Sequence, residues 1–133
     1  LSSAASDVYK RQAIRHVTTG TYLNQINAYE AMEIAPELEP LRDRLKAMKA
    51  LYEEAVSTVT ETKDNEYIDF HARRLVEMAG HIIMGHLLLL DTTRCASFRQ
   101  SAEVYINYGE AEVAKNSSFI KNFKAEELTN YRK

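Results

Sequence analysis

Four histidines are the residues of this 133-residue chain best suited to metal binding or proton transfer: His16, His71, His81 and His86. In helical bundles, a di-metal carboxylate site takes a Glu-x-x-His motif from each of two helices, because residues three apart share one inward face. The residues three positions before these histidines are alanine, isoleucine, methionine and isoleucine. The motif is therefore absent, and we predict no metal-ligating residue.

Glu77 and His81 are four residues apart and would lie on one face of a helix. They could form a structural hydrogen bond or share a metal ion. We favour the hydrogen bond, because an imidazole in apolar surroundings needs a polar partner. His86 follows His81 by five residues and would point in another direction, so the two rings would not share one ion.

Nucleophilic and nucleotide-dependent chemistry also lack their usual motifs. The chain contains no G-x-S-x-G elbow, no G-x-G-x-x-G turn and no phosphate loop. Its single cysteine, Cys95, cannot form an internal disulfide, and we expect it to be inert packing rather than a reactive thiol. A chain without a disulfide framework is typical of the cytoplasm. We therefore assign no catalytic, cofactor-binding or metal-ligating residue.

Two pairs of side chains suggest docking instead. Arg73 and Arg74 are adjacent, and Tyr105 and Tyr108 are three apart. Arginine and tyrosine are favoured at protein interfaces. The alternative is a solvated basic pair and two tyrosines at the edge of the core. The sequence leaves both readings open.

Residues 1–12 are predicted to be a sequencing-adapter artefact. The stretch SSAASDVYKRQ, Ser2 to Gln12, matches the in-frame translation of a transposase adapter used in shotgun DNA sequencing. Such scars are set aside before fold reasoning. Residues 13–133 are then expected to be a single helical domain, a metagenomic fragment from the C-terminal part of a larger enzyme.

The composition favours helices. There are two prolines and four glycines, and the β-branched residues do not alternate. The net charge of -2 is spread along the chain, which argues against a nucleic-acid partner. The longest apolar run, Ile82–Leu90, is shorter than the ~20 residues that a membrane span needs.

Apolar spacing predicts four helices, over about residues 21–34, 40–59, 65–90 and 97–121. Thr18 to Thr21 is expected to be a helix start or kink, and Asn65 and Ser97 are expected to be caps. Short polar links between the helices favour an all-α fold, an antiparallel four-helix bundle with up-down-up-down topology.

The third predicted helix has a clear inner face. It would bury Ile68, Ala72, Leu75, Ala79, Ile82 and His86 or Leu87. Its last third, Gly80–Leu90, is apolar on every side. Such a segment must be covered, either by its own domain or by something else.

Two stretches carry a resemblance to a known family. They are DFHARRLVEMAGHIIMGHLLLLD, Asp69 to Asp91, and SAEVYINYGEAEVAK, Ser101 to Lys115. Together they resemble the extreme C-terminal region of bacterial acyl-CoA dehydrogenases of the Bacteroidetes type. The resemblance covers about residues 40–125 and rests on overall pattern, not on an active-site motif. It implies an accessory helical domain that follows the dehydrogenase core.

The resemblance implies chemistry in the parent enzyme and none on this fragment. The parent would use FAD and a glutamate base to remove hydrogens from the α and β carbons of acyl-CoA. The substrate and flavin would both be bound by the upstream core, and the parent would form a homo-oligomer. No residue here matches that base or the flavin contacts. Membrane association, known in some relatives, has no supporting pattern.

A different class of function remains open from the residues alone. The chain could be a stand-alone helical protein-interaction or dimerisation module that docks through the apolar end of its third helix. A metal-binding bundle is a weaker third hypothesis. The accessory-domain hypothesis expects the isolated fragment to have no bound flavin and no enzyme activity.

Overall fold

The computed structural model describes residues 12–128, and these residues form helices and connecting turns without a strand. The all-α prediction is therefore confirmed. The elements are a helical segment at 12–18, α2 (Thr21–Glu30), η1 (Pro36–Leu38), α3 (Glu39–Thr60), α4 (Asn65–Arg94), η2 (Ala96–Phe98), α5 (Arg99–Asn122) and η3 (Ala125–Glu127).

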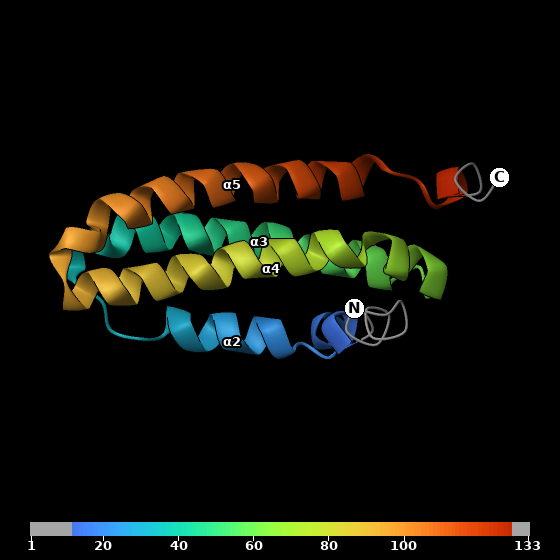
Figure 1. Cartoon of the computed structure of the whole chain (residues 1–133). Coiled ribbons are helices and arrows are strands. Elements are labelled where there is room, and N and C mark those ends of the chain that lie inside the picture. The colour runs from blue at the N-terminus through green and yellow to red at the C-terminus, as the bar shows by residue number, and fades with distance from the viewer. Residues whose placement is uncertain (1–11, 129–133) are drawn as a thin grey trace, which may run out of the picture.

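Three long helices form the body of the domain. α3, α4 and α5 each pack against the other two, and α2 packs on the α3 and α4 pair. Figure 1 shows α2 and α5 on opposite sides of that pair, with consecutive helices running in opposite directions. The short α2 thus covers part of a surface that α5 leaves open.

The first predicted helix is divided in two. Gly20 adopts a left-handed conformation, with φ 81°, between the segment 12–18 and α2. Glycine enters this region without the steric cost that a β-carbon imposes. The hydroxyl groups of Thr18 and Thr19 donate to the carbonyl of Arg15 and close the earlier segment. The expected kink at Thr18 to Thr21 is confirmed, and the described residues hold more helical segments than the four predicted.

α4 begins at residue 65 as predicted, but its cap and its last residue differ from the prediction. Its cap is Asp64, whose Oδ1 accepts from the backbone N–H groups of Glu66 at 3.0 Å and Tyr67 at 3.4 Å, so the prediction of Asn65 was wrong by one residue. The helix also continues four residues past Leu90, to Arg94. Its 30 residues correspond to a length of about 45 Å.

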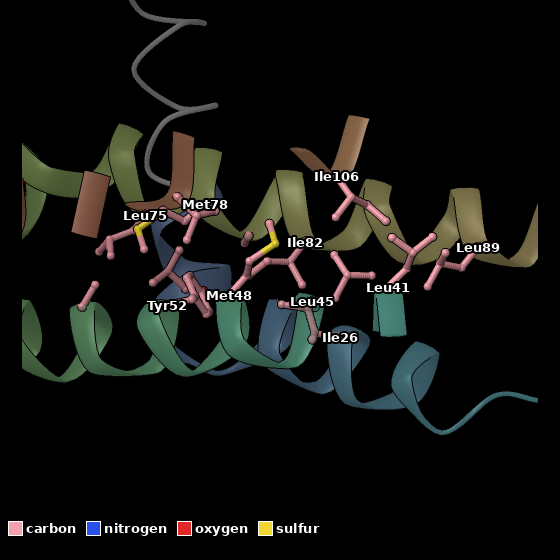
Figure 2. Close-up of a cluster of buried hydrophobic side chains, with 14 of the residues drawn as sticks. Ile26, Leu41, Leu45, Met48, Tyr52, Leu75, Met78, Ile82, Leu89 and Ile106 are labelled. Carbon is pink, nitrogen blue, oxygen red and sulfur yellow. The ribbon is translucent and has the colours of Figure 1, made fainter. Parts of the chain in front are cut away.

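The core lies where α3, α4 and α5 meet (Figure 2). On α3 an apolar stripe from Leu41 to Val59 is buried, and Figure 2 shows Leu41, Leu45, Met48 and Tyr52 of this stripe pointing toward α4. On α4, Leu75, Ala79, Ile82 and His86 are buried as predicted, whereas Ile68, Ala72 and Leu87 are half-buried. Burying one large aliphatic side chain contributes about 1.5–3 kcal/mol, so each of these buried residues stabilises the fold.

The facing of α5 was predicted only in part. Its buried positions are Ala102, Ile106, Gly109, Val113, Asn116 and Ile120. Their spacing alternates between four and three residues, which is the period of one helix face. Phe98, Tyr108 and Phe119 belong to the apolar residues from which this helix is predicted, but all three are exposed. Periodicity decides the facing here, and side-chain size does not.

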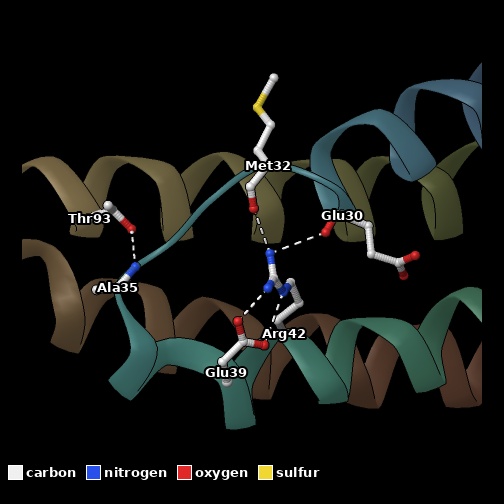
Figure 3. A network of polar contacts seen from close by, with 6 residues as sticks. All are labelled: Glu30, Met32, Ala35, Glu39, Arg42 and Thr93. Atoms are coloured by element: carbon white, nitrogen blue, oxygen red, sulfur yellow. Dashed lines mark hydrogen bonds and ion pairs between the residues drawn. The ribbon is translucent and has the colours of Figure 1, made fainter.

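Arg42 holds the connection between α2 and α3 (Figure 3). Its Nη1 donates to the carbonyl oxygens of Glu30 at 3.1 Å and Met32 at 2.6 Å, while its other nitrogens bind the Glu39 carboxylate. The Ala35 N–H donates to Thr93 on α4. The last carbonyls of a helix have no partner within it, and Arg42 supplies one for α2.

α4 is the one helix in the described part of the chain that is long and apolar enough to cross a membrane. Of its most apolar window, 44% is buried inside the bundle. A core helix has the same composition, so its length and apolarity are explained by its place between α2, α3 and α5.

Candidate interaction surfaces

The histidines do not come together. His71 and His86 are buried, and His81 is half-buried on the α4 and α5 side. His16 is exposed, and its ring packs edge-on against Tyr22. Among residues 12–128, no group of three or more histidine, cysteine, aspartate or glutamate side chains could hold a metal ion. That the chain binds no metal stays a prediction.

The predicted pair of Glu77 and His81 is not formed. Glu77 instead accepts a hydrogen bond from Arg73 Nε at 3.0 Å. His81 Nδ1 lies 3.2 Å from the hydroxyl of Tyr105, and its ring packs edge-on against Tyr108. The prediction of a Glu77 contact was wrong because a flexible arginine one turn away is the better partner for the carboxylate.

Burial keeps His71 and His86 neutral. Burial is the main cause that lowers the pKa of each imidazole to about 4, and for His71 the charge of nearby Arg74 contributes to the same shift. Neither ring nitrogen of His71 has a hydrogen-bond partner in the described part of the chain, nor does Nε2 of His86. These rings serve as packing groups at neutral pH.

Cys95 is exposed at the end of α4, so the prediction that it packs inside was wrong, while its low reactivity stays a prediction. Its Sγ lies 3.0 Å from Ser97 Oγ, and this hydrogen bond lowers the pKa of the thiol. Ser97 therefore pairs with the cysteine and does not cap α5. A lone exposed thiol defines no site.

The aromatic cluster lies where α4 begins and α5 ends. It consists of Tyr67, Phe70, His71, Phe119 and Phe123, whose ring centroids lie 4.7–6.5 Å apart in the contacting pairs. The hydroxyl of Tyr67 donates to the carbonyl of Phe123 at 3.0 Å in the interior. The cluster therefore holds the chain after α5 against α4.

The adjacent arginines behave differently from each other. The Arg73 side chain is 89% exposed and pairs with Glu77, as expected for a solvated arginine. Arg74 lies over the aromatic cluster, with Cζ 4.0 Å from the ring centroid of Phe119 and 5.2 Å from that of Phe70. Its Nη1 donates to the carbonyl of Phe70. The sequence pair is thus one solvated arginine and one that is held in place.

A groove of about 390 Å³ lies between α4 and α5 beside the aromatic cluster. Sequence reasoning did not identify it, because its residues come from two helices whose register the sequence does not reveal. It is lined by Phe70, Arg73, Arg74, Glu77, Lys115, Asn116 and Phe119. Four of the seven lining residues are charged, so the groove offers no enclosed apolar slot for an isoalloxazine ring and does not fit a flavin.

An exposed apolar strip lies further along the same two helices. Met84, Val104 and Tyr108 are 44%, 62% and 56% exposed. Val104 and Tyr108 are one turn apart on α5. On α4, Met84 follows His81 by one turn, and the ring of His81 contacts Tyr108. The three side chains therefore share one face, which we call the Met84–Tyr108 strip. Of the predicted tyrosine pair, Tyr108 belongs to this surface, and Tyr105 is half-buried behind it.

The apolar end of α4 is mostly covered by the domain itself. Ile82, Gly85, His86 and Leu89 are buried, and only Met84 is classed as exposed among residues 81–90. Within the described residues, α2, α3 and α5 therefore cover most of this segment.

Comparison with known proteins identifies the kind of domain. Residues 18–128 match the protein family described as Acyl-CoA dehydrogenase C terminal. The match includes α2 through α5 and their connections. The chain belongs to this family.

A solved structure supports the same assignment. The crystal structure of the acyl-CoA dehydrogenase family protein from Porphyromonas gingivalis is 49% identical in sequence, with a TM-score of 0.81. The similarity covers 85% of this chain and 98% of that chain. Nearly all of the solved chain is therefore this helical domain. No curated protein matches the chain.

Proposed function

We propose that this accessory C-terminal domain acts by packing on the core of a flavin-dependent acyl-CoA dehydrogenase or by joining its subunits, and takes no part in the chemistry. The family match over residues 18–128 is the observation that carries the proposal. FAD and acyl-CoA would be bound by the core upstream. The Met84–Tyr108 strip supports a contact on the α4 and α5 face, because an exposed cluster of large apolar side chains favours a protein partner.

The finer structural assignments belong to the same proposal. Residues 13–133 form one domain, and the segment 12–18 together with α2 acts as the first helix of an up-down-up-down four-helix bundle. Residues 1–12 are an adapter artefact, although all but Gln12 lie outside the described residues. The parent enzyme is a cytoplasmic homo-oligomer. Cys95 of this chain is exposed and forms no disulfide, which suits a reducing compartment such as the cytoplasm.

The experiment is a binding measurement between this chain and a separately expressed dehydrogenase core, by analytical ultracentrifugation. We expect the core to carry the yellow flavin absorbance, the chain to be colourless, and the mixture to sediment as a complex. Tyr108→Glu should weaken the complex at least tenfold, because it places a charge in an apolar contact. Met32→Glu is the control, since Met32 is also an exposed apolar residue, at 44% against 56% for Tyr108, but lies just after α2.

Two results would overturn the proposal. One is a purified chain that carries flavin and dehydrogenates acyl-CoA by itself. The other is a chain that shows no association with the core at concentrations well above those in the cell. Equal weakening by Tyr108→Glu and Met32→Glu would reject the Met84–Tyr108 strip as the contact.

The alternative is a stand-alone dimerisation module, which the same exposed strip would also serve. It predicts that the chain alone dimerises, and that Tyr108→Glu returns it to the monomer. An accessory domain that packs on the core is expected to be a monomer in the absence of the core. Sedimentation of the isolated chain over a concentration series separates the two.

A further inference from the structure

The groove between α4 and α5 contains an arginine that is already oriented. The guanidinium of Arg74 is fixed from two directions, by the Phe119 ring beneath it and by the carbonyl of Phe70 that accepts from Nη1. No carboxylate of the described residues forms an ion pair with it. Its remaining N–H groups can therefore bind an oxyanion with little further loss of side-chain entropy.

The other charges of the groove leave an excess of positive charge. Arg73, Arg74 and Lys115 line it against a single carboxylate, Glu77, which pairs with Arg73. Lys115 pairs with Glu112 at 2.8 Å, but its side chain remains 66% exposed and so can turn toward a ligand. An anion in the groove would therefore meet two cations, Arg74 and Lys115, on its two sides.

Asn116 provides an independent observation. It lines the groove from α5, is only 4% exposed, and its Nδ2 has no hydrogen-bond partner in residues 12–128. A buried donor without an acceptor is unfavourable, and it occurs rarely unless a ligand, ion or water supplies the acceptor. Asn116 lines the groove between Arg74 and Lys115. A rotation of its side chain would bring Nδ2 to an oxygen atom of an anion bound there.

We propose that this groove binds a small organic oxyanion, a carboxylate or phosphate group attached to an apolar body. Arg74 and Lys115 pair with the charge, Asn116 Nδ2 donates to one oxygen after its side chain rotates, and the partly exposed Phe119 contacts the apolar part. The volume of about 390 Å³ lies in the range of small-molecule sites. This inference does not depend on the packing of the domain against a dehydrogenase core.

The test is an NMR titration of the isotope-labelled chain at constant ionic strength. The probes are phenyl phosphate, benzoate and the uncharged benzyl alcohol. We expect saturating shifts of the Asn116 side-chain amide and the Arg74 Nε–H signal with at least one anion, and none with benzyl alcohol. Phenyl phosphate and benzoate are separate arms, so their relative affinities identify which oxyanion the groove prefers.

Two variants make the result specific. Arg74→Gln should weaken binding about tenfold or more, because it removes a charge-assisted hydrogen bond. Arg99→Gln is the matched control, since Arg99 lies elsewhere on α5 and pairs with Glu103 in the way Arg73 pairs with Glu77. Asn116→Leu should also weaken binding while the melting temperature stays the same or rises, an outcome that a purely structural role for Asn116 does not give.

Three outcomes would overturn the proposal. The first is the absence of a saturating shift with both anions at millimolar concentration. The second is equal weakening by Arg74→Gln and Arg99→Gln, which would mean unspecific attraction. The third is saturation by an acidic peptide when neither small anion shifts the signals, which would make the groove a protein contact.

Discussion

Gly85 of α4 faces Leu45 of α3 so closely that a β-carbon at position 85 would lie 2.5 Å from Leu45 Cδ2. Both residues are buried, and Leu45 is fully enclosed by the core. The absence of a side chain at residue 85 therefore sets how closely α3 and α4 approach. Gly80, one turn and a half earlier on the same helix, is exposed and has no such neighbour within 4 Å.

The two glycines should respond oppositely to alanine. Gly80→Ala should stabilise the domain by up to about 1 kcal/mol, because alanine is the better helix former. Gly85→Ala gains the same propensity but must displace a packed leucine, which costs about 1–3 kcal/mol, so we expect a net loss. Urea unfolding of the two variants measures the difference. A Gly85→Ala variant as stable as Gly80→Ala would contradict the close α3 and α4 contact.

A double-mutant cycle assigns the loss to Leu45. Leu45→Ala alone should cost about 2–5 kcal/mol, as large-to-small changes in a core do. In that background, Gly85→Ala should be less harmful than in the original chain, because the displaced atoms are gone. Strict additivity of the two changes would mean that Leu45 is not the neighbour that resists alanine.

The buried histidines should make the domain sensitive to acid. The pKa of His71 and of His86 is lowered to about 4, first by burial, and for His71 also by Arg74. For His86, the charge of Glu30 raises the pKa, whereas the charges of Arg42 and Lys49 lower it. Between about pH 4 and 6.5 the unfolded chain binds more protons than the folded one. Stability should therefore be full above this window and fall as the pH drops through it.

The measurement is the free energy of unfolding against pH for the chain and for His71→Phe. The loss between pH 6.5 and 4 should be on the order of 2–3 kcal/mol per histidine, and the variant should lose less. The exposed His16→Asn serves as the control and should follow the parent curve. A parent and a His71→Phe variant with the same pH dependence would mean that His71 is not buried in the neutral form.

Arg42 should matter more than an ordinary surface arginine. It donates to the carbonyls of Glu30 and Met32 and binds Glu39, and its side chain is 14% exposed. Arg42→Met should cost about 1–3 kcal/mol, because the two carbonyls lose their charged donor. Arg73→Met, which removes an exposed pair with Glu77, should stay within about 0.5 kcal/mol of the parent. Similar stability of both variants would remove the role assigned to Arg42.

Leu75 tests the inner face of α4. It is fully buried, as the sequence pattern predicts, so Leu75→Asp should unfold the domain by placing an unpaired charge in the core. Glu66→Asp is a suitable neighbour control, because residue 66 is exposed in the first turn of the same helix. Circular dichroism reports the outcome. A cooperative melt of Leu75→Asp near that of the parent would place Leu75 outside the core.

The sequence predicted those features that depend on local spacing. The buried stripe from Leu41 to Val59 follows a helix period, and the break at Gly20 follows from its backbone freedom, so both were found. The contacts of Glu77 and Arg74 were missed, because each side chain had more than one partner within reach. Which partner such a side chain chooses depends on its rotamer and on energy differences below about 1 kcal/mol. Sequence spacing alone does not reveal either of them.

The candidate sites were harder to predict than the fold for a related reason. The groove combines Arg74 from α4 with Lys115, Asn116 and Phe119 from α5. Its existence depends on the register between two antiparallel helices some forty residues apart in sequence. The sequence offered one signal for this site. Asn116 stands at a position of the buried face of α5, where the helix period calls for a hydrophobic residue.

The central claim is that this chain is the C-terminal accessory domain of a flavin-dependent acyl-CoA dehydrogenase, and the reading frame upstream of Ala13 tests it most directly. Primer extension outward from the codons of α3, on DNA from the original sample, would recover that frame. We expect an in-frame dehydrogenase core whose product binds FAD and oxidises acyl-CoA. A start codon directly before Ala13, with no core joined to it, would contradict the account.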